Sequence, residues 1–330
     1  MGRHVEVLHE RFPIRGVFRI SRGEKTVADV VRVVVGDDGA RGRGECVPYP
    51  RYGQSVDGVV AEIESVRPAL EGGAGVHDVQ DLLPAGPARN AVECALWDLQ
   101  ARTGGSRASG LLPAHAPLRP LVTAFTISLD TPERMAAGAA AAASRAMPLL
   151  KLKLGGDGDL ERVRAVRVAA PRARLIADAN ESWSPEQVGA FAPVLAGLGV
   201  ELLEQPLPAG FDDALAGYDG PLPLSADESC QDAASVAGLA DRYAAVTVKL
   251  DKTGGIVGAV ATLAAARDAG MRTMLGCMVA TSLSMAPGLV PAQLAEFVHL
   301  DGPLLLAHDR EPGLPYDGAL VGPSNEVWVA

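Results

Sequence analysis

The sequence predicts an α/β protein, in which a small N-terminal α+β domain precedes a parallel (β/α)8-type barrel. The chain has 330 residues and is 48% hydrophobic, which is enough to build a sizeable core. Hairpin-like strands and then helical patterns fill the first third of the chain. From about residue 118, short apolar runs alternate with helical stretches eight times.

The N-terminal part contains strand and helix signals in that order. Residues 28–36, "ADVVRVVVG", and the following turn "GDDGARGRG" predict a hairpin strand. Residues 56–71 and 85–103 then have helical patterns. In the second, apolar residues recur at helical spacing from Val92 to Leu99, and Gly104 ends the pattern. These signals indicate a small α+β domain.

The rest of the chain contains eight strand candidates at a period near 25 residues. They are 120–128, 149–154, 173–180, 200–206, 222–229, 244–250, 272–278 and 295–302. Helix-like stretches between them include 159–170, 184–198, 231–242 and 255–269. The alternative is an open doubly wound sheet. The period stays constant with no switch in pattern, and this favours the barrel.

Composition and charge exclude several classes of function. The formal net charge is −10, whereas a nucleic-acid-binding protein needs a basic face. The N-terminus has no apolar run like that of a signal peptide, and the Ala-rich 136–147 stretch is too short to span a bilayer. Scattered cysteines without a CxxC pair indicate reduced thiols, so we expect a cytoplasmic protein. The cysteines are Cys46, Cys94, Cys230 and Cys277.

Three carboxylates follow three successive predicted strands. In the segments "LIADAN", "VELLEQP" and "LPLSADES", an acid follows the apolar run at the expected end of the strand. These acids are Asp178, Glu204 and Asp227, at spacings of 26 and 23 residues. In a parallel barrel these strand ends face the same mouth, where active sites lie. Each acid alone could be a helix cap or a surface charge. Three converging carboxylates would repel one another, and all-oxygen ligation favours Mg²⁺ or Mn²⁺ between them.

Lysines lie on two strands on either side of these acids. Lys151 and Lys153, in "LLKLKL", are two residues apart and point to the same face of a strand. Lys249 ends strand six in the same way, so Lys153 and Lys249 would face each other across the cation. The alternative is that these side chains extend from the rim into solvent.

This geometry predicts proton transfer next to a carboxylate. A substrate carboxylate held by the cation becomes an enediolate when its α-proton leaves, and the cation offsets the developing charge. One lysine would remove the proton and the other would return it to the opposite face. We expect burial, together with the positive charge of Lys151 and of the cation, to lower the pKa of this lysine pair towards working pH.

The ordered motifs "KLK", "DAN", "EQP", "ADES" and "VKLDKTGG" resemble the muconate-lactonizing subgroup of the enolase superfamily. The helix "AVECALWDLQA" resembles the capping-domain signature of that subgroup. The resemblance covers nearly the whole chain. It implies a (β/α)7β modified TIM barrel, residues 118–308, with an N-terminal α+β capping domain, residues 1–117. A C-terminal segment, residues 309–330, is expected to return to the capping domain.

Within the subgroup, the chain resembles the dipeptide epimerases, typified by L-Ala-D/L-Glu epimerase. The segments "GECVPYPRYGQS", "ISRGEKT", "KLDKTGG" and "LDGPLLL" carry this resemblance. It implies an isomerase with Lys153 and Lys249 as the acid/base pair and a small dipeptide as substrate. The implied Mg²⁺ ligands are Asp178, Glu204 and Asp227. The implied substrate-binding residues are Arg22, Thr126, Lys151, Cys277, Met278, Val279, His299 and Asp301. Arg22 is equally well interpreted as an exposed loop cation. The oligomeric state is left open, and a homo-oligomer is one possibility.

One position departs from the pattern of these epimerases. They carry Asp-X-Asp at strand eight, where both acids hold the dipeptide ammonium, whereas this chain has His299-Leu300-Asp301. A protonated His299 would repel an ammonium group, and a neutral one would accept a hydrogen bond. The substitution therefore points to a different N-terminal residue or to an N-acylated amino acid, unless Asp301 alone suffices. Ala280 also stands where some relatives carry a glutamate.

Two alternative functions remain. The first is an N-acylamino acid racemase or an o-succinylbenzoate synthase-like lyase, which would use the same lysines and metal ligands. The second is a non-catalytic ligand-binding protein of this superfamily. A binding protein does not need opposed bases, so the full set of lysines and acids argues against it.

Overall fold

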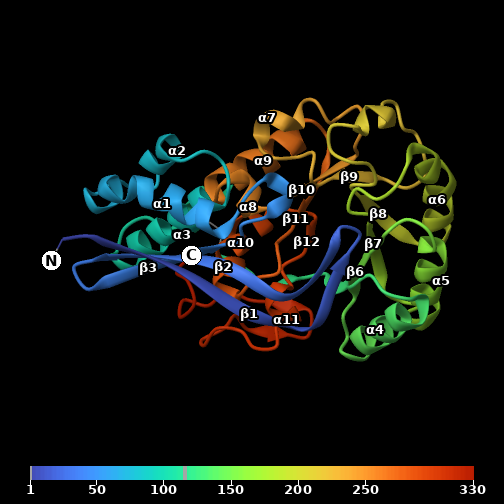
Figure 1. Ribbon diagram of the computed structural model, residues 1–330, viewed down its shortest axis with the longest axis horizontal. Coiled ribbons are helices and arrows are strands. Elements are labelled where there is room, and N and C mark those ends of the chain that lie inside the picture. The colour runs from blue at the N-terminus through green and yellow to red at the C-terminus, as the bar shows by residue number, and fades with distance from the viewer. Residues whose placement is uncertain (1, 114–116) are drawn as a thin grey trace.

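The computed structural model describes residues 2–113 and 117–330, with a capping domain beside a barrel (Figure 1). The first three strands form an antiparallel sheet in the order β1-β2-β3. Two 3-10 helices, Pro50–Tyr52 and Ala108–Leu111, lie in the connections. The strands and helices are β1 (His4–Ile20), β2 (Gly23–Asp37), β3 (Ala40–Cys46), α1 (Val56–Glu71), α2 (Asp78–Leu82) and α3 (Pro87–Arg102).

Helix α3 is the centre of the capping domain. Nearly all of its side chains are buried, as expected for a helix with neighbours on several sides. The sheet approaches it closely because β3 carries Gly42 and Gly44. A Cβ atom at either glycine would lie 2.0 Å from a carbonyl oxygen of α3, that of Ala95 or Ala91. Any larger residue would therefore push the sheet away from the helix.

The barrel is one parallel sheet whose strands follow in chain order, β5 to β12. The ring closes where Ala124, just before β5, donates a backbone hydrogen bond of 2.8 Å to Val298 of β12. All eight predicted strands are confirmed. The open doubly wound alternative is wrong, because the strand order has no switch point. The strands are β5 (Phe125–Ile127), β6 (Leu149–Lys153), β7 (Arg174–Asp178), β8 (Val200–Glu204), β9 (Leu224–Ala226), β10 (Ala245–Val248), β11 (Arg272–Leu275) and β12 (Phe297–Val298).

Helices connect most of the barrel strands. The helix predicted over 231–242 is shorter than expected, because only four residues of it, in α7, are helical. Between β8 and β9 the connection carries a 3-10 helix, Asp212–Leu215, in place of an α-helix. The helices are α4 (Pro132–Ser144), α5 (Asp159–Ala169), α6 (Pro185–Gly197), α7 (Ala233–Val236), α8 (Leu250–Thr253), α9 (Ile256–Asp268), α10 (Ser282–Ala292) and α11 (Gly302–Leu305).

The C-terminal segment crosses back to the capping domain. Its short strands β13 (Tyr316–Asp317) and β14 (Leu320–Val321) pair with β4 (Leu121–Val122) in a separate sheet. Trp328 Nε1 then donates to the carbonyl oxygen of Cys94 in α3, and Val329 N donates to Asp98 Oδ1. The end of the chain therefore contacts α3 of the capping domain. In the described part of the chain, every helix is too short or too polar to cross a bilayer.

Helix α3 also supplies the missing caps of two barrel helices. Glu93 Oε1 accepts the backbone N–H of Val257 in the first turn of α9, whose own N-cap residue is a glycine. The guanidinium of Arg89 donates to the carbonyl oxygens of Thr253 and Gly254 at the end of α8. Helix termini need such partners for their unpaired backbone groups. The capping domain therefore completes the barrel on either side of the short segment that follows Lys249.

A buried carboxylate joins the two domains at the same place. Asp251, on α8, is 6% exposed, and its Oδ1 accepts hydrogen bonds from Asn90 Nδ2 at 2.8 Å and from the backbone N–H of Val47 at 3.2 Å. Burial raises the pKa of Asp251 to about 7, although the two donors oppose the shift. Between the ordinary pKa of an aspartate and about pH 7, the folded state therefore holds a proton that the unfolded state has lost.

We expect the stability of the protein to fall as the pH rises through this window, and to fall less in the Asp251→Asn variant. The folded state binds more protons than the unfolded state there, so raising the pH favours unfolding. Urea unfolding measures the free energy of unfolding at pH 5 and at pH 8. Between these two values the wild type should lose on the order of 2–3 kcal/mol more than the variant, since one pKa unit is about 1.4 kcal/mol. An identical pH dependence in both proteins would show that Asp251 is already ionised in the fold.

Candidate active site and metal centre

The three predicted acids come together at the mouth of the barrel. Asp178 and Glu204 end β7 and β8 and are register partners, and Asp227 follows β9 directly. All three are 0% exposed. Parallel strands place their carboxyl ends at one rim, and the apolar residues before each acid fill the interior behind them. The sequence therefore buries three carboxylates on adjacent strands.

The predicted lysines lie among these acids and on either side of them. Lys153 Nζ donates to Asp178 Oδ2 at 2.6 Å, and Lys249 Nζ donates to Asp227 Oδ2 at 2.6 Å. Lys153 ends β6 and Lys249 follows β10, so β7, β8 and β9 with their acids lie between the two lysines. Lys151 is deeper, and its Nζ lies 2.6 Å from Glu204 Oε2 and 3.2 Å from Asp178 Oδ2.

The charged groups in this cluster shift the pKa values of the acids by different amounts and in different directions. Burial raises the pKa of Glu204 to about 7, and Asp178 beside it adds to the increase. Burial would also raise the pKa of Asp178, but Lys153 and Lys151 hold it well below its usual range. Glu204 is therefore the acid whose negative charge is least compensated by the protein.

The carboxylates around two of the lysines raise their pKa values. Burial lowers the pKa of Lys249, but Asp227, together with Glu204 and Glu228, holds that pKa well above its usual range. Glu204 and Asp178 together raise the pKa of Lys151 against the effect of burial. The expected lowering for the catalytic lysines includes the positive charge of a bound cation, and it stays a prediction.

A divalent cation fits this set of residues. Neither oxygen of Glu204 accepts a hydrogen bond from a described residue, although Oε2 is in ion-pair contact with Lys151. Buried carboxylate oxygens normally have such partners, so unpaired ones indicate space for a ligand. The acids offer only hard oxygen donors, which is the preference of Mg²⁺. A cation here would be held by Asp178, Glu204 and Asp227.

A cavity of about 440 Å³ opens between the barrel mouth and the capping domain. Lys153 and Lys249 line it, whereas the three acids and Lys151 lie behind its wall. Lys151 was predicted to contact substrate, but its amine is engaged by acids in this structure. All other predicted substrate residues line the cavity, namely Arg22, Thr126, Cys277, Met278, Val279, His299 and Asp301. Ala280 is fully buried and outside this lining.

The capping loops are fastened over one end of the cavity by arginine–glutamate pairs. Arg22, in the β1–β2 turn that reaches across the barrel, donates to Glu181 Oε2 at 2.8 Å and to Glu228 Oε1 at 2.7 Å (Figure 1). Arg51 forms two further hydrogen bonds with Glu181, both 2.6 Å. The Arg22 side chain is therefore paired in this structure and is 25% exposed, whereas an exposed loop cation would lie in solvent.

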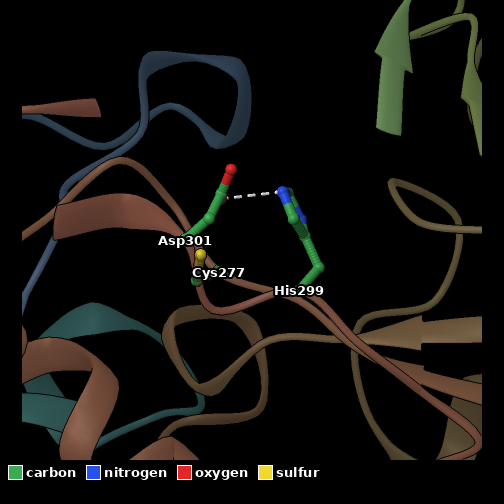
Figure 2. Close-up of side chains that lie close together, drawn as sticks. All are labelled: Cys277, His299 and Asp301. Carbon is green, nitrogen blue, oxygen red and sulfur yellow. Dashed lines mark ion pairs between the residues drawn. The ribbon is translucent and has the colours of Figure 1, made fainter. Parts of the chain in front are cut away.

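Another part of the cavity lining comes from the segments that follow β11 and β12, where Cys277, His299 and Asp301 lie close together (Figure 2). His299 Nε2 lies 2.9 Å from Asp301 Oδ1 and 2.8 Å from Thr126 Oγ1, and Asp301 Oδ2 accepts the backbone N–H of Thr126. Burial lowers the pKa of His299, so the ring is neutral at pH 7. The ionised Asp301 can only accept, so Nε2 carries the hydrogen and Nδ1 is an acceptor. Nδ1 has no partner among the described residues.

Four residues of the site were not found from the sequence. Lys252 is fully buried, and its Nζ donates to Asp227 Oδ1 at 2.7 Å and to two carbonyl oxygens. It was part of the "KLDKTGG" motif, which was the available signal. Glu228 belongs to "ADES" in the same way. Arg51 and Glu181 meet only through the fold, because they are 130 residues apart.

Comparison with known families gives two matches that together cover most of the chain. Residues 2–112 match the N-terminal domain of the mandelate racemase / muconate lactonizing enzyme family. Residues 134–324 match the Enolase C-terminal domain-like family.

Curated proteins and solved structures give consistent similarities. An L-Ala-D/L-Glu epimerase of Escherichia coli (strain K12) is 45% identical, over 95% of this chain and 98% of its own. An N-acetyl-D-glutamate racemase of Pseudoalteromonas sp. is 38% identical, over 91% and 95%. An Agrobacterium tumefaciens enolase family member with bound sodium and L-Ala-L-Glu has a TM-score of 0.95 at 48% identity, covering 99% of both chains. A Methylococcus capsulatus dipeptide epimerase, complexed with Mg and L-Arg-D-Lys, has a TM-score of 0.86 at 28% identity, covering 98% of both.

We expect Glu204→Gln to weaken Mg²⁺ binding by about 100-fold or more, which exceeds the 10–100-fold typical of losing an outer hydrogen-bond partner. The substitution removes the least compensated charge and keeps the size of the side chain. Isothermal titration of the purified protein with Mg²⁺ measures the affinity. Glu181→Gln is the matched control, because Glu181 is buried at the same mouth but is engaged by two arginines. Equal weakening in both variants would place the ion elsewhere.

Proposed function

Since the chain belongs to the mandelate racemase / muconate lactonizing enzyme family of the enolase superfamily, we propose that it is a dipeptide epimerase. It inverts the configuration at the carbon next to the substrate carboxylate by moving one proton. The observation that carries the proposal is the pair of cavity-lining lysines on opposite sides of the acid cluster. Curated relatives and bound dipeptides in similar structures support the same activity.

The two lysines divide the proton transfer between the two faces of the substrate. In one direction Lys153 takes the α-proton and Lys249 delivers a proton to the opposite face, and in the other direction the roles reverse. Each amine is hydrogen-bonded to a different acid, Asp178 or Asp227, which fixes its position. Two bases on opposite faces are needed for inversion, because one base returns the proton to the side it came from.

The remaining buried groups prepare the site for a carboxylate. When bound, a divalent cation would neutralise negative charge developing on the substrate carboxylate. Asp178, Glu204 and Asp227 would hold this cation, Mg²⁺ or Mn²⁺. Lys151 lies between Asp178 and Glu204 and keeps the two like charges together. Lys252 compensates the charge of the third acid, Asp227.

The lining of the cavity supports a small charged substrate. Arg22, Lys25 and Arg51 lie under the capping loops, and the acids Glu24, Asp29 and Glu228 belong to the same lining. Asp301, Lys153 and Lys249 line the cavity as well. An acidic side chain of a substrate would bind the cations through charge-assisted hydrogen bonds. We therefore propose L-Ala-D/L-Glu or a related acidic dipeptide as substrate.

The net charge of −10 argues for a small molecule rather than a nucleic acid as the partner of this protein. We also propose that the enzyme is cytoplasmic.

His299 favours a second candidate function, the racemisation of an N-acylated acidic amino acid. The ring is neutral and Asp301 already accepts from Thr126, so this part of the cavity carries a single, partly engaged negative charge. An acyl group needs no negative charge, whereas a free ammonium group does. The similar N-acetyl-D-glutamate racemase supports this alternative.

Changing Lys153 to Ala should stop epimerisation but leave hydrogen exchange of one substrate enantiomer. The remaining Lys249 still reaches the α-proton on its own face, so that proton should exchange in deuterated water. We expect epimerisation to fall by about 10²–10⁴-fold, the usual contribution of a positioned acid or base. Mass spectrometry of an L-Ala-L-Glu or L-Ala-D-Glu solution with Mg²⁺ reports both quantities.

Lys249→Ala is the matched control for this experiment. It should show the reciprocal pattern, with exchange confined to the other configuration. If both variants fold, as judged by circular dichroism, and neither exchanges any α-proton, the two-base assignment is wrong. Exchange of the same configuration in both variants would place the lysines on one face.

The choice between the two candidate functions can be tested at His299. His299→Asp adds a second negative charge in the part of the cavity where an ammonium would bind. A charge-assisted hydrogen bond contributes roughly 1–3 kcal/mol, so the ratio of kcat/KM for L-Ala-L-Glu to that for N-acetyl-L-Glu should rise about tenfold or more. His299→Asn, which keeps the site neutral, is the control and should leave the ratio near that of the wild type. An unchanged ratio in both variants would separate His299 from substrate choice.

A further inference from the structure

The part of the cavity wall that follows β11 and β12 contains three different side chains able to bind a metal. Cys277, His299 and Asp301 each offer one ligand atom, and the three atoms lie within 4.8 Å of one another (Figure 2). His299 and Asp301 are buried, Cys277 is half-buried, and all three line the cavity. The cluster is therefore both protected and reachable from the space where a substrate binds.

We propose that Cys277, His299 and Asp301 form a second metal site, which takes a thiophilic divalent cation of the Zn²⁺ class and blocks the cavity. A thiolate, an imidazole nitrogen and a carboxylate are the ligand types that Zn²⁺ uses, with a water or substrate atom in the fourth position. The Asp178–Glu204–Asp227 cluster offers oxygen only and suits Mg²⁺. The cavity thus joins a hard site and a softer site, and the softer one goes beyond the proposed function.

The geometry is close to that of a bound ion. At the bond lengths typical of Zn²⁺, the ligand atoms of a tetrahedral site lie about 3.3–3.8 Å apart. His299 Nε2 and Asp301 Oδ1 are already 2.9 Å apart, so the two must separate slightly while the Cys277 sulfur moves in. Shifts of about 1 Å are within the reach of side-chain rotation. Both strand ends face the cavity, so the backbone can stay in place.

His299 has to change tautomer to bind such an ion. Its Nε2 is the ring atom near Asp301 Oδ1, and it carries the ring hydrogen in this structure. Nδ1 is buried without a hydrogen-bond partner among the described residues, so it can take up that hydrogen and leave the Nε2 lone pair for the ion.

Metal binding at this site needs no reactant other than the ion and water. The S–H bond of Cys277 breaks, its proton passes to water, and the thiolate forms the bond to the metal. Asp301 is already ionised, and the neutral His299 contributes a lone pair. One proton is therefore released for each metal ion bound, and no oxidation is involved. The ion would lie in the lining of the cavity, so a substrate bound there would meet it.

Co²⁺ titration of the Mg²⁺-saturated protein tests the site directly. A thiolate ligand produces a sulfur-to-cobalt charge-transfer band in the near ultraviolet, whereas Co²⁺ at the all-oxygen site produces none. We expect one thiolate-bound Co²⁺ per chain, displaced by Zn²⁺. The band should vanish in Cys277→Ser and persist in Cys46→Ser, the matched control at a fully buried cysteine outside this cavity wall. His299→Ala should weaken the Co²⁺ affinity at least tenfold.

Two results would overturn the proposal: no band in the wild-type protein, or a band that survives in Cys277→Ser. Thermal melting of each variant shows whether it is folded. A kinetic readout then follows, in which Zn²⁺ should raise the apparent KM for L-Ala-L-Glu in the presence of excess Mg²⁺, and should do so at least tenfold less strongly in Cys277→Ser. The spectroscopic test needs no substrate. It therefore stands or fails separately from the epimerase activity.

Discussion

Compensation of buried charge is the constraint on which this protein depends. Three carboxylates are buried at neighbouring strand ends, where an isolated charge would be far too costly to hold. Four lysines, Lys151, Lys153, Lys249 and Lys252, make ion pairs with them. Because the lysines compensate the acids unevenly, the Glu204 oxygens accept no hydrogen bond from the described residues, although Oε2 is in ion-pair contact with Lys151. The same arrangement that makes the fold tolerable thus leaves room for a cation and holds two amines on either side of it.

The capping domain is the second part of this arrangement. It closes the cavity through Arg22 and Arg51, which converge on one glutamate three residues after Asp178. The backbone there is held in the left-handed region, with φ of 45° at Asn180 and 68° at Glu181. Such conformations are uncommon for residues with side chains and are kept where the surroundings enforce them. The loop after β7 therefore serves the acid cluster on one side and the capping loops on the other.

Much of this architecture could be predicted from the sequence because its signals are local. Each barrel strand is a short apolar run, and each functional acid or lysine lies at or just beyond the end of one. The pairing of Arg51 with Glu181 could not be predicted in this way, since no local pattern links residues that only the fold brings together. The raised pKa values of Lys151 and Lys249 could not be predicted for a related reason. They depend on which carboxylate each amine touches, and a strand pattern fixes the face but not the partner. Helix α7 is short although its pattern extends over 231–242, which shows that apolar spacing alone does not set where a helix ends.

Because α3 of the capping domain caps two helices of the barrel, it limits how the domains of related proteins can be recombined. Glu93 and Arg89 complete the ends of two barrel helices, and those helices immediately follow Lys249. A chimera that joins this barrel to the first domain of a relative inherits intact active-site residues, yet loses these helix caps unless the donor carries an acid and a cation at the same two positions. Compatibility at the seam, rather than the catalytic motif, then decides which halves can be exchanged.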